Sequence, residues 1–432
     1  MKIAFFTDTF LPQRNGVVTS ISNTLDILCK KHYVCLFVPG KKTFRVENKS
    51  KNLKIVNVPS FRFKQYKSYR IPKLQLKEIS KIMEREKFDV IHIHTPFTLG
   101  LIGIAMSRLH SIPVVGTYHT YLPEYFPHIT KGRLYKVMKK IGKFPSKKFT
   151  KYVYSKLDYV VAPSEETARM LKSLELKKVK VISNGIRLEK FKTEKKIIAQ
   201  IKKKYKIPID KNVLLFLGRI SFEKKLSVLF NAFKILENEE ENVFLLIVGS
   251  GPYIKKYKKE VKNLGLKNIR FTGFVKDKLI PLVYHVSDIF VSPSNTEICP
   301  VTFIEAMACG LPLIGVNGGG VKDIIHDGKN GFLARPNDPI SLAFKIKTLL
   351  DKKELIKKMS RINHQLVREY SIENSTRKLL NLYGKMKVRK EKPHSFYTIV
   401  DLFLHPEMIK HKVSKKFRRG KKLRTVLIYL LS

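Results

Sequence analysis

Short, continuously apolar runs recur along the chain, and stretches with helical spacing of apolar residues separate them. Strict alternation of apolar and polar positions would indicate strands with one wet face, whereas continuous runs indicate parallel strands covered on both faces. The runs predict strands at Lys2–Thr9, Tyr33–Val38, Lys54–Val58, Val90–His94, Val114–Tyr118, Tyr159–Ala162, Val179–Ser183, Val213–Leu217, Val243–Val248, Ile269–Thr272, Ile289–Ser292 and Leu313–Val316.

The strands and helices alternate in two series, which predicts an α/β fold of two doubly wound, Rossmann-like domains. A length of 432 residues agrees with more than one core. We expect an N-terminal domain over 1–189, a charged linker over 190–211, and a C-terminal domain over 212–375. A helix and a basic tail follow over 376–432.

Residues with candidate chemistry lie directly after predicted strands. In doubly wound sheets, ligands bind beyond the carboxyl ends of the strands. Gly16 follows the first strand, His119 follows the fifth, Arg219 follows the first strand of the second series, and Glu297 follows the strand that ends at Ser292. The pattern predicts a site at these strand ends.

Two elements of the second series predict a pocket for a sugar nucleotide. Arg219 and Lys224 stand where a strand gives way to a helix, a position suited to a diphosphate. Glu297 and Glu305 stand eight positions apart, and carboxylates accept hydrogen bonds from sugar and ribose hydroxyls. The alternative for the two cations is a solvated basic turn.

The run around Glu305 favours a short helix that stops at Gly310 and Pro312. Pro300 sets an extended turn before it, so the amides of Val301 and Thr302 remain available at the helix N-terminus. A phosphate or sugar hydroxyl can bind there.

Other motifs are weaker. Gly318–Gly320 would let a loop pass close to a nucleotide, and Asp327–Gly331 is typical of a hairpin turn. His92 and His94 alternate along a strand like a metal-binding pair, but no third ligand is near in sequence, so we expect them to be structural. The Gly-x-Gly-x-x-Gly fingerprint is absent, so NAD is not expected.

The formal net charge is +50, with lysine far in excess of arginine. A genome that favours lysine codons would explain a diffuse excess. Residues 131–156, however, hold ten cations and no acid, and 410–424 are similar. Such blocks attract anionic lipid or nucleic acid. Residues 131–156 fit either a core helix or a membrane-surface helix, because apolar positions keep helical spacing there.

Four cysteines without metal-site spacing fit buried thiols in a reducing compartment. The N-terminus is not typical of a signal peptide, and the apolar runs are too short to span a bilayer. We therefore expect a protein of the cytoplasm or the cytoplasmic face of a membrane.

As a set, these motifs resemble the retaining glycosyltransferases with the GT-B fold that include sucrose synthase and phosphatidylinositol mannosyltransferases. The resemblance covers most of residues 1–385 and rests on Asn15-Gly16-Val-Val-x-Ser, Ser183-Asn184-Gly185-Ile, Gly218-Arg219 with Lys224, and the Glu297/Glu305 pair. The N-terminal motif and Gly116-Thr-Tyr-His-Thr are most similar to the diacylglycerol glycosyltransferases of bacterial membranes.

The resemblance implies two domains that face a cleft, with the acceptor bound by the first and the donor by the second. Arg219 and Lys224 would hold the diphosphate, and Glu305 the ribose. Glu297 and the backbone of Ile298, Cys299, Pro300 and Val301 would bind the hexose. The Gly16 loop would approach the diphosphate, and His119 would contact the sugar near its 6-hydroxyl.

The resulting hypothesis is a retaining hexosyltransferase that uses a UDP-hexose and 1,2-diacylglycerol, peripheral on an anionic membrane surface, with no metal or cofactor required and no nucleic acid bound. The sequence does not choose between glucose and galactose. Two alternatives stay open. One is another acceptor, such as a phosphoinositide or a lipopolysaccharide-type core. The other is a non-catalytic basic protein that binds lipid or nucleic acid.

Overall fold

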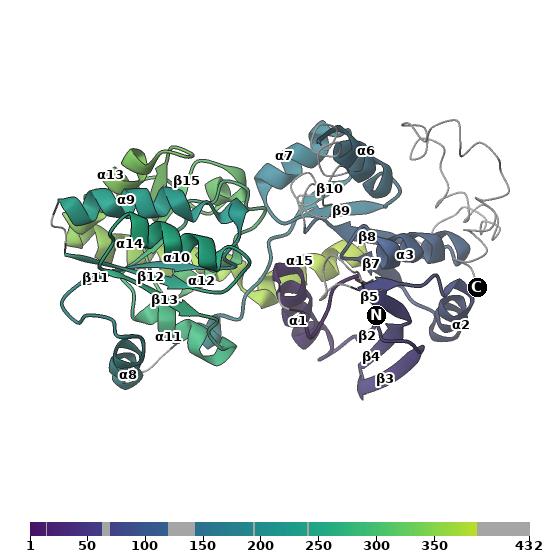
Figure 1. The fold of residues 1–432 in the computed structure, drawn as a ribbon. Coiled ribbons are helices and arrows are strands. Elements are labelled where there is room, and N and C mark those ends of the chain that lie inside the picture. The colour runs from purple at the N-terminus through teal and green to yellow at the C-terminus, as the bar shows by residue number, and fades with distance from the viewer. Residues whose placement is uncertain (14, 63–69, 120–142, 193–194, 240–241, 387–432) are drawn as a thin grey trace, which may run out of the picture. The chain divides into compact units, whose positions relative to one another are not determined.

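The chain folds into two compact units (Figure 1). The computed structural model describes residues 1–13, 15–62, 70–119, 143–192, 195–239 and 242–386. Unit 1 comprises Met1–Pro163, Ala168–Ile182 and the stretch that begins at Thr376, and unit 2 comprises Ser164–Thr167 and Ser183–Ser375. Unit 2 is thus inserted between two parts of unit 1 along the chain.

The sheet of unit 2 has six strands, all parallel, in the order β13-β12-β11-β14-β15-β16. The strands are β11 Asn212–Leu217, β12 Val243–Val248, β13 Ile269–Gly273, β14 Ile289–Val291, β15 Leu313–Val316 and β16 Gly331–Ala334. This is the 3-2-1-4-5-6 order of a Rossmann fold. The order reverses between β11 and β14, so their carboxyl ends border the crevice where such sheets bind ligands.

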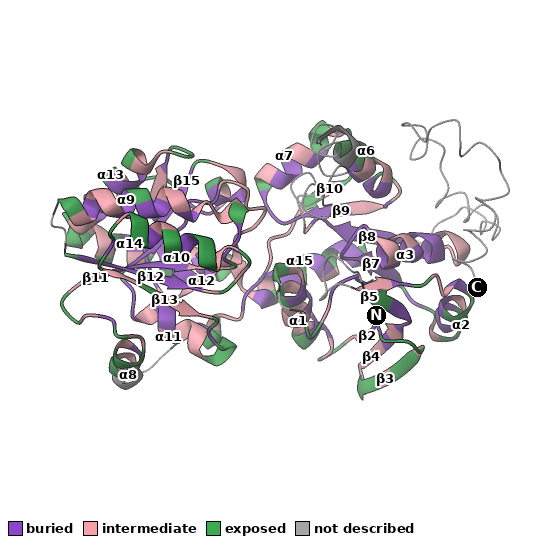
Figure 2. Ribbon diagram, viewed as in Figure 1, coloured by how far each residue is buried: buried purple, intermediate pink, exposed green. Residues whose placement is uncertain are grey.

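Helices cover both faces of this sheet, which is why its strands read as continuous apolar runs (Figure 2). One face packs on α9 Leu226–Asn238, α10 Ile254–Asn263, α13 Pro339–Leu350 and α14 Lys353–Leu366. The other packs on α8 Lys195–Tyr205, α11 Ile280–His285, α12 Val301–Ala308 and the 3-10 helices η1 Leu188–Phe191 and η5 Val367–Tyr370. All six residues of β12 are buried.

Unit 1 repeats the same winding with eight strands, in the order β10-β9-β8-β7-β1-β2-β4-β3. The strands are β1 Lys2–Phe6, β2 Tyr33–Pro39, β3 Arg45–Ser50, β4 Leu53–Val58, β7 Val90–Ile93, β8 Val114–Thr117, β9 Tyr159–Ala162 and β10 Val179–Val181. Only the edge strand β3 is antiparallel to its neighbour in this sheet. The order reverses between β1 and β7.

One face of the unit 1 sheet packs on α1 Gly16–Leu28 and on α15 Ile372–Gly384, which lies beside α1 in Figure 1. Leu379, Leu382 and Tyr383 of α15 are buried against α1 and the strands. The helix α3 Thr98–Leu109 covers the other face, where Gly103 lies against the side chains of Phe6 and Ile93. The last described helix, α15, therefore belongs to the hydrophobic core of unit 1.

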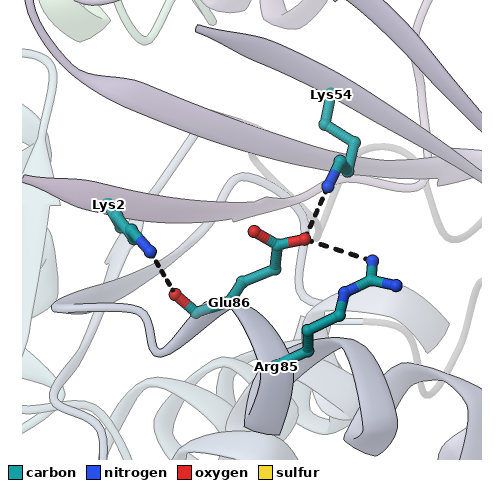
Figure 3. Close-up of polar contacts among 4 residues, drawn as sticks. All are labelled: Lys2, Lys54, Arg85 and Glu86. Carbon is teal, nitrogen blue, oxygen red and sulfur yellow. Dashed lines mark hydrogen bonds and ion pairs between the residues drawn. The ribbon is translucent and has the colours of Figure 1, made fainter.

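An ion pair and a hydrogen bond attach the C-terminus of α2 Leu76–Glu86 to strands β4 and β1, and a second ion pair lies within α2 (Figure 3). Lys54 Nζ lies 2.5 Å and Arg85 Nη2 3.1 Å from Glu86 Oε1, and Lys2 Nζ donates to the Glu86 carbonyl at 2.9 Å. Cations at a helix C-terminus also complement its dipole.

Further elements complete the described chain. They are the ribbon of β5 Ser60–Arg62 and β6 Arg70–Pro72, the helices α6 Lys143–Tyr154 and α7 Glu165–Ser173, and the 3-10 helices η2 Phe222–Lys224, η3 Asp277–Leu279 and η4 Gly319–Asp323.

The linker predicted for 190–211 is wrong. These residues form the end of η1 and all of α8, and their apolar side chains belong to the core of unit 2. Phe191, Ile201 and Ile207 are 7%, 5% and 4% exposed. The many lysines obscured the pattern, because exposed residues such as Lys203 and Lys204 follow the buried Ile201 closely in sequence. The main segment of unit 2 accordingly begins at Ser183, not at the first strand of its sheet.

The hairpin predicted at Asp327–Gly331 is also wrong. The turn is present, but it leads into β16, which runs parallel to β15. The apolar run Gly331–Ala334 is only four residues long and escaped detection as a strand.

The basic block at 131–156 is described only from Lys143 onward, within α6. There Val153 and Tyr154 are buried while Lys147, Lys148 and Lys151 are exposed. The core-helix interpretation therefore holds for this part. Leu134 to Ile141 and the tail 410–424 lie outside the described residues. Within the described ranges, no helix is long and apolar enough to cross a membrane.

Two isoleucines of the predicted linker test its role. Ile201→Ala removes a side chain that is 5% exposed, and we expect a loss of about 2–5 kcal/mol of stability. Ile209 is 87% exposed, so Ile209→Ala should stay within about 0.5 kcal/mol of wild type. Denaturant unfolding measures both. A true linker would give two variants indistinguishable from wild type.

Candidate functional site

The candidate residues gather at the switch point of each sheet. In unit 2 the segments after β11 and β14 carry Arg219, Lys224 and Glu297, and these two strands are paired neighbours. In unit 1, Gly16 follows β1, and His119 follows β8, which pairs with β7.

Lys224 and Glu297 form an ion pair in unit 2. Lys224 Nζ lies 2.5 Å from Glu297 Oε1, and the two side chains are 21% and 18% exposed. The residues are 73 positions apart in sequence. The parallel pairing of β11 and β14 brings them together. Arg219 lies at the end of β11 and is exposed. The result is a cation beside a carboxylate at the strand ends.

The three glycines Gly318–Gly320 form a strap that packs against the loop containing Glu297. The Gly320 N–H donates to the carbonyl of Glu297 at 2.6 Å. A Cβ at Gly319 would lie 2.5 Å from that carbonyl oxygen, and one at Gly320 would collide with the carbonyl of Ile298. Gly319 also has a φ of +54°. The close approach predicted for Gly318–Gly320 is therefore to the protein's own loop.

In the segment from Ile298 to Val301, Pro300 is buried and the other three residues are half-buried. Cys299 and Val301 pack against the apolar cluster beneath, and burial raises the pKa of the Cys299 thiol to about 11. Pro300 is extended (φ −75°, ψ 93°) and caps α12, which begins at Val301. The first amides of a helix have no partner within it and can serve as donors.

Glu305 lies in the middle of α12, four residues after Val301, where the helix begins as the sequence predicted. Its Oε2 accepts a hydrogen bond of 2.8 Å from the hydroxyl of Tyr284 on α11. Burial raises the pKa of Glu305 to about 7, with Asp277 raising it further and Tyr284 and Lys190 opposing the shift. One carboxylate oxygen is thus held by the protein.

In unit 1, Asn15 fixes the start of α1. Its Oδ1 accepts from the Val18 N–H at 3.0 Å, and its Nδ2 donates to Thr9 Oγ1 at 2.9 Å. Gly16 is exposed, and a Cβ added there would meet nothing within 4 Å. The protein itself therefore does not require glycine at this position.

Asp8, at the end of β1, is 1% exposed and was not singled out from the sequence. Oδ1 accepts from the Leu99 N–H at 3.0 Å, and Oδ2 accepts from the Thr95 hydroxyl at 2.6 Å. Burial raises its pKa to about 6. Asp8 holds the first turn of α3 against the switch point of unit 1.

Three histidines meet where β7 and β8 end. His92 and His94 stack with ring centroids 4.1 Å apart, and His94 stacks on His119 at 5.5 Å. The third histidine that the sequence lacked nearby is thus present in space. Within the described residues, however, no group of three or more His, Cys, Asp or Glu is arranged to hold a metal ion.

Burial in this stack lowers the pKa of His92 to about 3, that of His119 to about 4, and that of His94 well below its usual value. All three rings are therefore neutral at physiological pH.

Sequence reasoning identified Glu305 and His119 but not the side chains that hold them. Tyr284 precedes Glu305 by 21 residues, and His94 precedes His119 by 25. Tyr284 carried no local signal. The sequence did single out His94, as part of a histidine pair in a strand. That β8 lies beside this strand and brings His119 to it is known only from the sheet topology.

The chain has the GT-B fold, which consists of two Rossmann-like domains. Solved structures agree on the fold. HepE from Anabaena in complex with UDP superposes with a TM-score of 0.71 at 18% identity, covering 89% of this chain and 100% of its own. Sucrose-phosphate synthase from Thermosynechococcus elongatus gives a TM-score of 0.72 at 18% identity, covering 89% and 98%.

Residues 14–190 match the family described as Glycosyltransferase Family 4, and residues 197–365 match Glycosyl transferases group 1. Alpha-monoglucosyldiacylglycerol synthase of Streptococcus pneumoniae is 33% identical over 77% of this chain and 75% of its own length. The enzyme of the same name from Acholeplasma laidlawii is 29% identical over 79% and 86%. The chain belongs to the family 4, group 1 type glycosyltransferases, and its relatives include these two alpha-monoglucosyldiacylglycerol synthases.

The raised pKa of Glu305 makes stability depend on pH. Between about pH 4.5 and 7 the unfolded carboxyl ionises while the folded one keeps its proton, so stability falls as the pH rises. Glu305→Gln has no carboxyl to titrate. Relative to wild type, we expect the free energy of unfolding of Glu305→Gln to rise by about 3 kcal/mol at most between pH 5 and pH 8.

Thermal unfolding midpoints at the two pH values measure this effect. Glu260→Gln, at a carboxylate on α10 that accepts from the Ser227 hydroxyl, is the control and should follow wild type. Parallel pH profiles for wild type and Glu305→Gln would contradict the assigned environment.

Proposed function

We propose that this protein is a retaining hexosyltransferase that transfers glucose or galactose from a UDP-sugar to 1,2-diacylglycerol, giving a monoglycosyl diacylglycerol. The observation that carries the proposal is the Lys224–Glu297 pair at the switch point of unit 2, with Arg219 in the same segment as Lys224. It combines charge for a diphosphate with an acceptor for sugar hydroxyls.

The donor roles follow from the geometry within unit 2. An ammonium group carries three N–H donors, so Lys224 can keep Glu297 in place and still donate to a diphosphate oxygen. Glu297 then offers its remaining acceptor sites to hexose hydroxyls, together with the backbone from Ile298 to Val301. Glu305 is held by Tyr284 through one oxygen, which leaves the other for the ribose diol.

The chemistry that we propose is a front-face displacement with retention of the α-configuration. The C1–oxygen bond to the diphosphate breaks, and the acceptor hydroxyl attacks from the same face. Its proton passes to the departing diphosphate oxygen. Arg219 and Lys224 stabilise the charge that develops there, which is the largest type of contribution in such reactions. This route requires no carboxylate nucleophile and no metal.

The names of related proteins support the substrates. Two relatives, 33% and 29% identical, are alpha-monoglucosyldiacylglycerol synthases, and HepE has been solved with UDP-glucose. Another relative, 29% identical, is a galactosyltransferase from Escherichia coli that uses UDP-Gal. Hence the lipid acceptor has more support than the choice of hexose.

For the acceptor side we propose His119 and the Gly16 loop in unit 1. We further propose peripheral binding to the cytoplasmic face of the membrane, where the basic surface meets anionic lipid. Each lysine near such a surface contributes about 1 kcal/mol. The exposed lysines of α6 belong to this surface in our proposal.

Two adjacent lysines provide a matched test of the donor site. Lys224→Ala and Arg219→Ala should lower kcat by about 10²–10³-fold, because each removes charge that stabilises the leaving diphosphate. The control is Lys225→Ala, since the Lys225 ammonium donates instead to Asn337 Oδ1 at 2.7 Å. Turnover of UDP-hexose on diacylglycerol vesicles measures all three.

A wild-type rate in Lys224→Ala or Arg219→Ala would contradict the donor site. A loss in Lys225→Ala equal to that in Lys224→Ala would also contradict it, because the effect would then follow net charge rather than position.

Product analysis tests the reaction itself. With diacylglycerol in anionic vesicles and either UDP-glucose or UDP-galactose, we expect an α-linked monohexosyl lipid, identified by the anomeric coupling in its proton NMR spectrum. Raising the salt concentration should weaken binding to the vesicles, because exposed charges are screened.

A β-linked product would exclude retention. Transfer only to another lipid or glycan would favour the alternative acceptor, and failure to bind or hydrolyse any UDP-sugar would favour a non-catalytic binding protein. Vesicle binding that is independent of salt would remove the electrostatic contact.

A further inference from the structure

His92 holds one end of the histidine stack of unit 1, which consists of His92, His94 and His119. Its Nδ1 lies 2.6 Å from the hydroxyl of Tyr383, and its Nε2 lies 2.7 Å from Thr117 Oγ1. Both partners are hydroxyl groups, which can donate or accept. Both ring nitrogens of His92 are therefore satisfied in either tautomer, and the ring is fixed in place.

His94 connects this anchor to His119. It is 4% exposed and is held between the ring of His92 and the edge of Phe5, whose centroid is 4.5 Å away. Its Nδ1 lies 3.3 Å from Nε2 of His119. Its Nε2 is buried and has no hydrogen-bond partner among the residues that the structure describes. Among the described residues, the His94 ring therefore makes a single hydrogen bond, and its partner is His119.

This asymmetry selects the proton positions. If Nδ1 of His94 carries the proton, it donates to His119 Nε2, and the unpaired Nε2 of His94 is a bare lone pair. In the opposite arrangement the unpaired atom would be a buried N–H. In protein interiors, a buried N–H without a partner is rarer than an acceptor without one. The first arrangement is therefore favoured, and it leaves the proton of His119 on Nδ1.

We propose that His94 is a positioning residue that fixes His119 as its Nδ1–H tautomer. His119 then offers one N–H donor to an oxygen atom of the substrate and does not accept a proton. Among the described residues no hydrogen bond occupies Nδ1 of His119, so this atom is its ligand-facing group. The ligand chemistry is an oxygen acceptor, either a sugar hydroxyl or a diphosphate oxygen.

The tautomer follows from unit 1 alone, while the identity of the substrate oxygen rests on the proposed function. His119 therefore binds and orients substrate, and proton transfer during the reaction takes place elsewhere. This agrees with a mechanism in which the departing diphosphate takes the acceptor proton.

The first experiment needs no substrate. In full-length protein labelled with ¹⁵N-histidine, long-range ¹H–¹⁵N correlation spectra identify which ring nitrogen carries the proton. We expect His119 in wild type to show a protonated Nδ1 and a bare Nε2 from pH 6 to pH 8. His94→Asn should preserve this pattern, because its amide NH₂ can take the place of Nδ1–H.

His94→Phe keeps a flat apolar ring but removes the donor, so His119 should become a mixture of tautomers. His110→Asn, at the far end of α3 with its own contact to Ser80, is the control and should leave the His119 signals unchanged. A proton on Nε2 of His119 in wild type, or an unchanged tautomer in His94→Phe, would overturn the proposal. The wild-type and His94→Asn spectra decide it even if His94→Phe does not fold.

Kinetics provide a second measurement. Asn places its amide near the position of Nδ1, whereas Gln places it near Nε2. We therefore expect His119→Asn to retain more activity than His119→Gln. His94→Phe should raise KM by about three- to tenfold, as expected for one weakened hydrogen bond, and His94→Asn should restore it.

Equal losses in His119→Asn and His119→Gln would overturn the assignment of Nδ1 as the ligand-facing atom. If wild type shows the expected tautomer but transfers no sugar from any donor, the proposed function fails while the positioning role of His94 stands.

Discussion

Strands β11 and β14 pair in parallel at the middle of the unit 2 sheet, and the arrangement of the donor-side cluster depends on that pairing. Parallel neighbours end at the same edge, so the segments that follow them meet although the chain between them makes two further strands and three helices. The Lys224–Glu297 ion pair forms where these segments meet. Unit 1 obeys the same constraint, with β1 and β7 at its switch point and Asp8 bonded across to Thr95 and Leu99. Two sheets of unlike size thus place polar residues at equivalent positions.

The winding of both sheets was predictable, because continuous apolar runs have few other solutions. The strands that the sequence did not predict were short or polar. β16 has four residues, and the edge strand β3 is mostly exposed. The linker over 190–211 failed for a different reason. Lysines dominate the composition of this segment, and they hid the apolar residues that belong to the core of unit 2. In an amphipathic helix, the exposed polar residues can dominate the composition and hide the smaller number of buried apolar residues.

The candidate site divides in a similar way. Residues whose chemistry is evident from type and spacing, such as Glu297 and Lys224, could be found from the sequence. Their supports could not, because Tyr284, His94 and the Gly318–Gly320 strap act through contacts that only the folded chain defines. The strap shows the limit clearly. A run of glycines indicates close approach but does not say to what, and here the neighbour is the backbone of the Glu297 loop.

The return of α15 to unit 1 has a consequence for biosynthesis. The apolar face of α1 is completed by Leu379, Leu382 and Tyr383, which leave the ribosome after all of unit 2. The N-terminal unit, although made first, therefore finishes its core last, while the inserted unit has its complete sequence earlier. A nascent chain that stops before residue 376 would carry an uncovered hydrophobic face. During synthesis that face is a binding surface for chaperones and a route to aggregation.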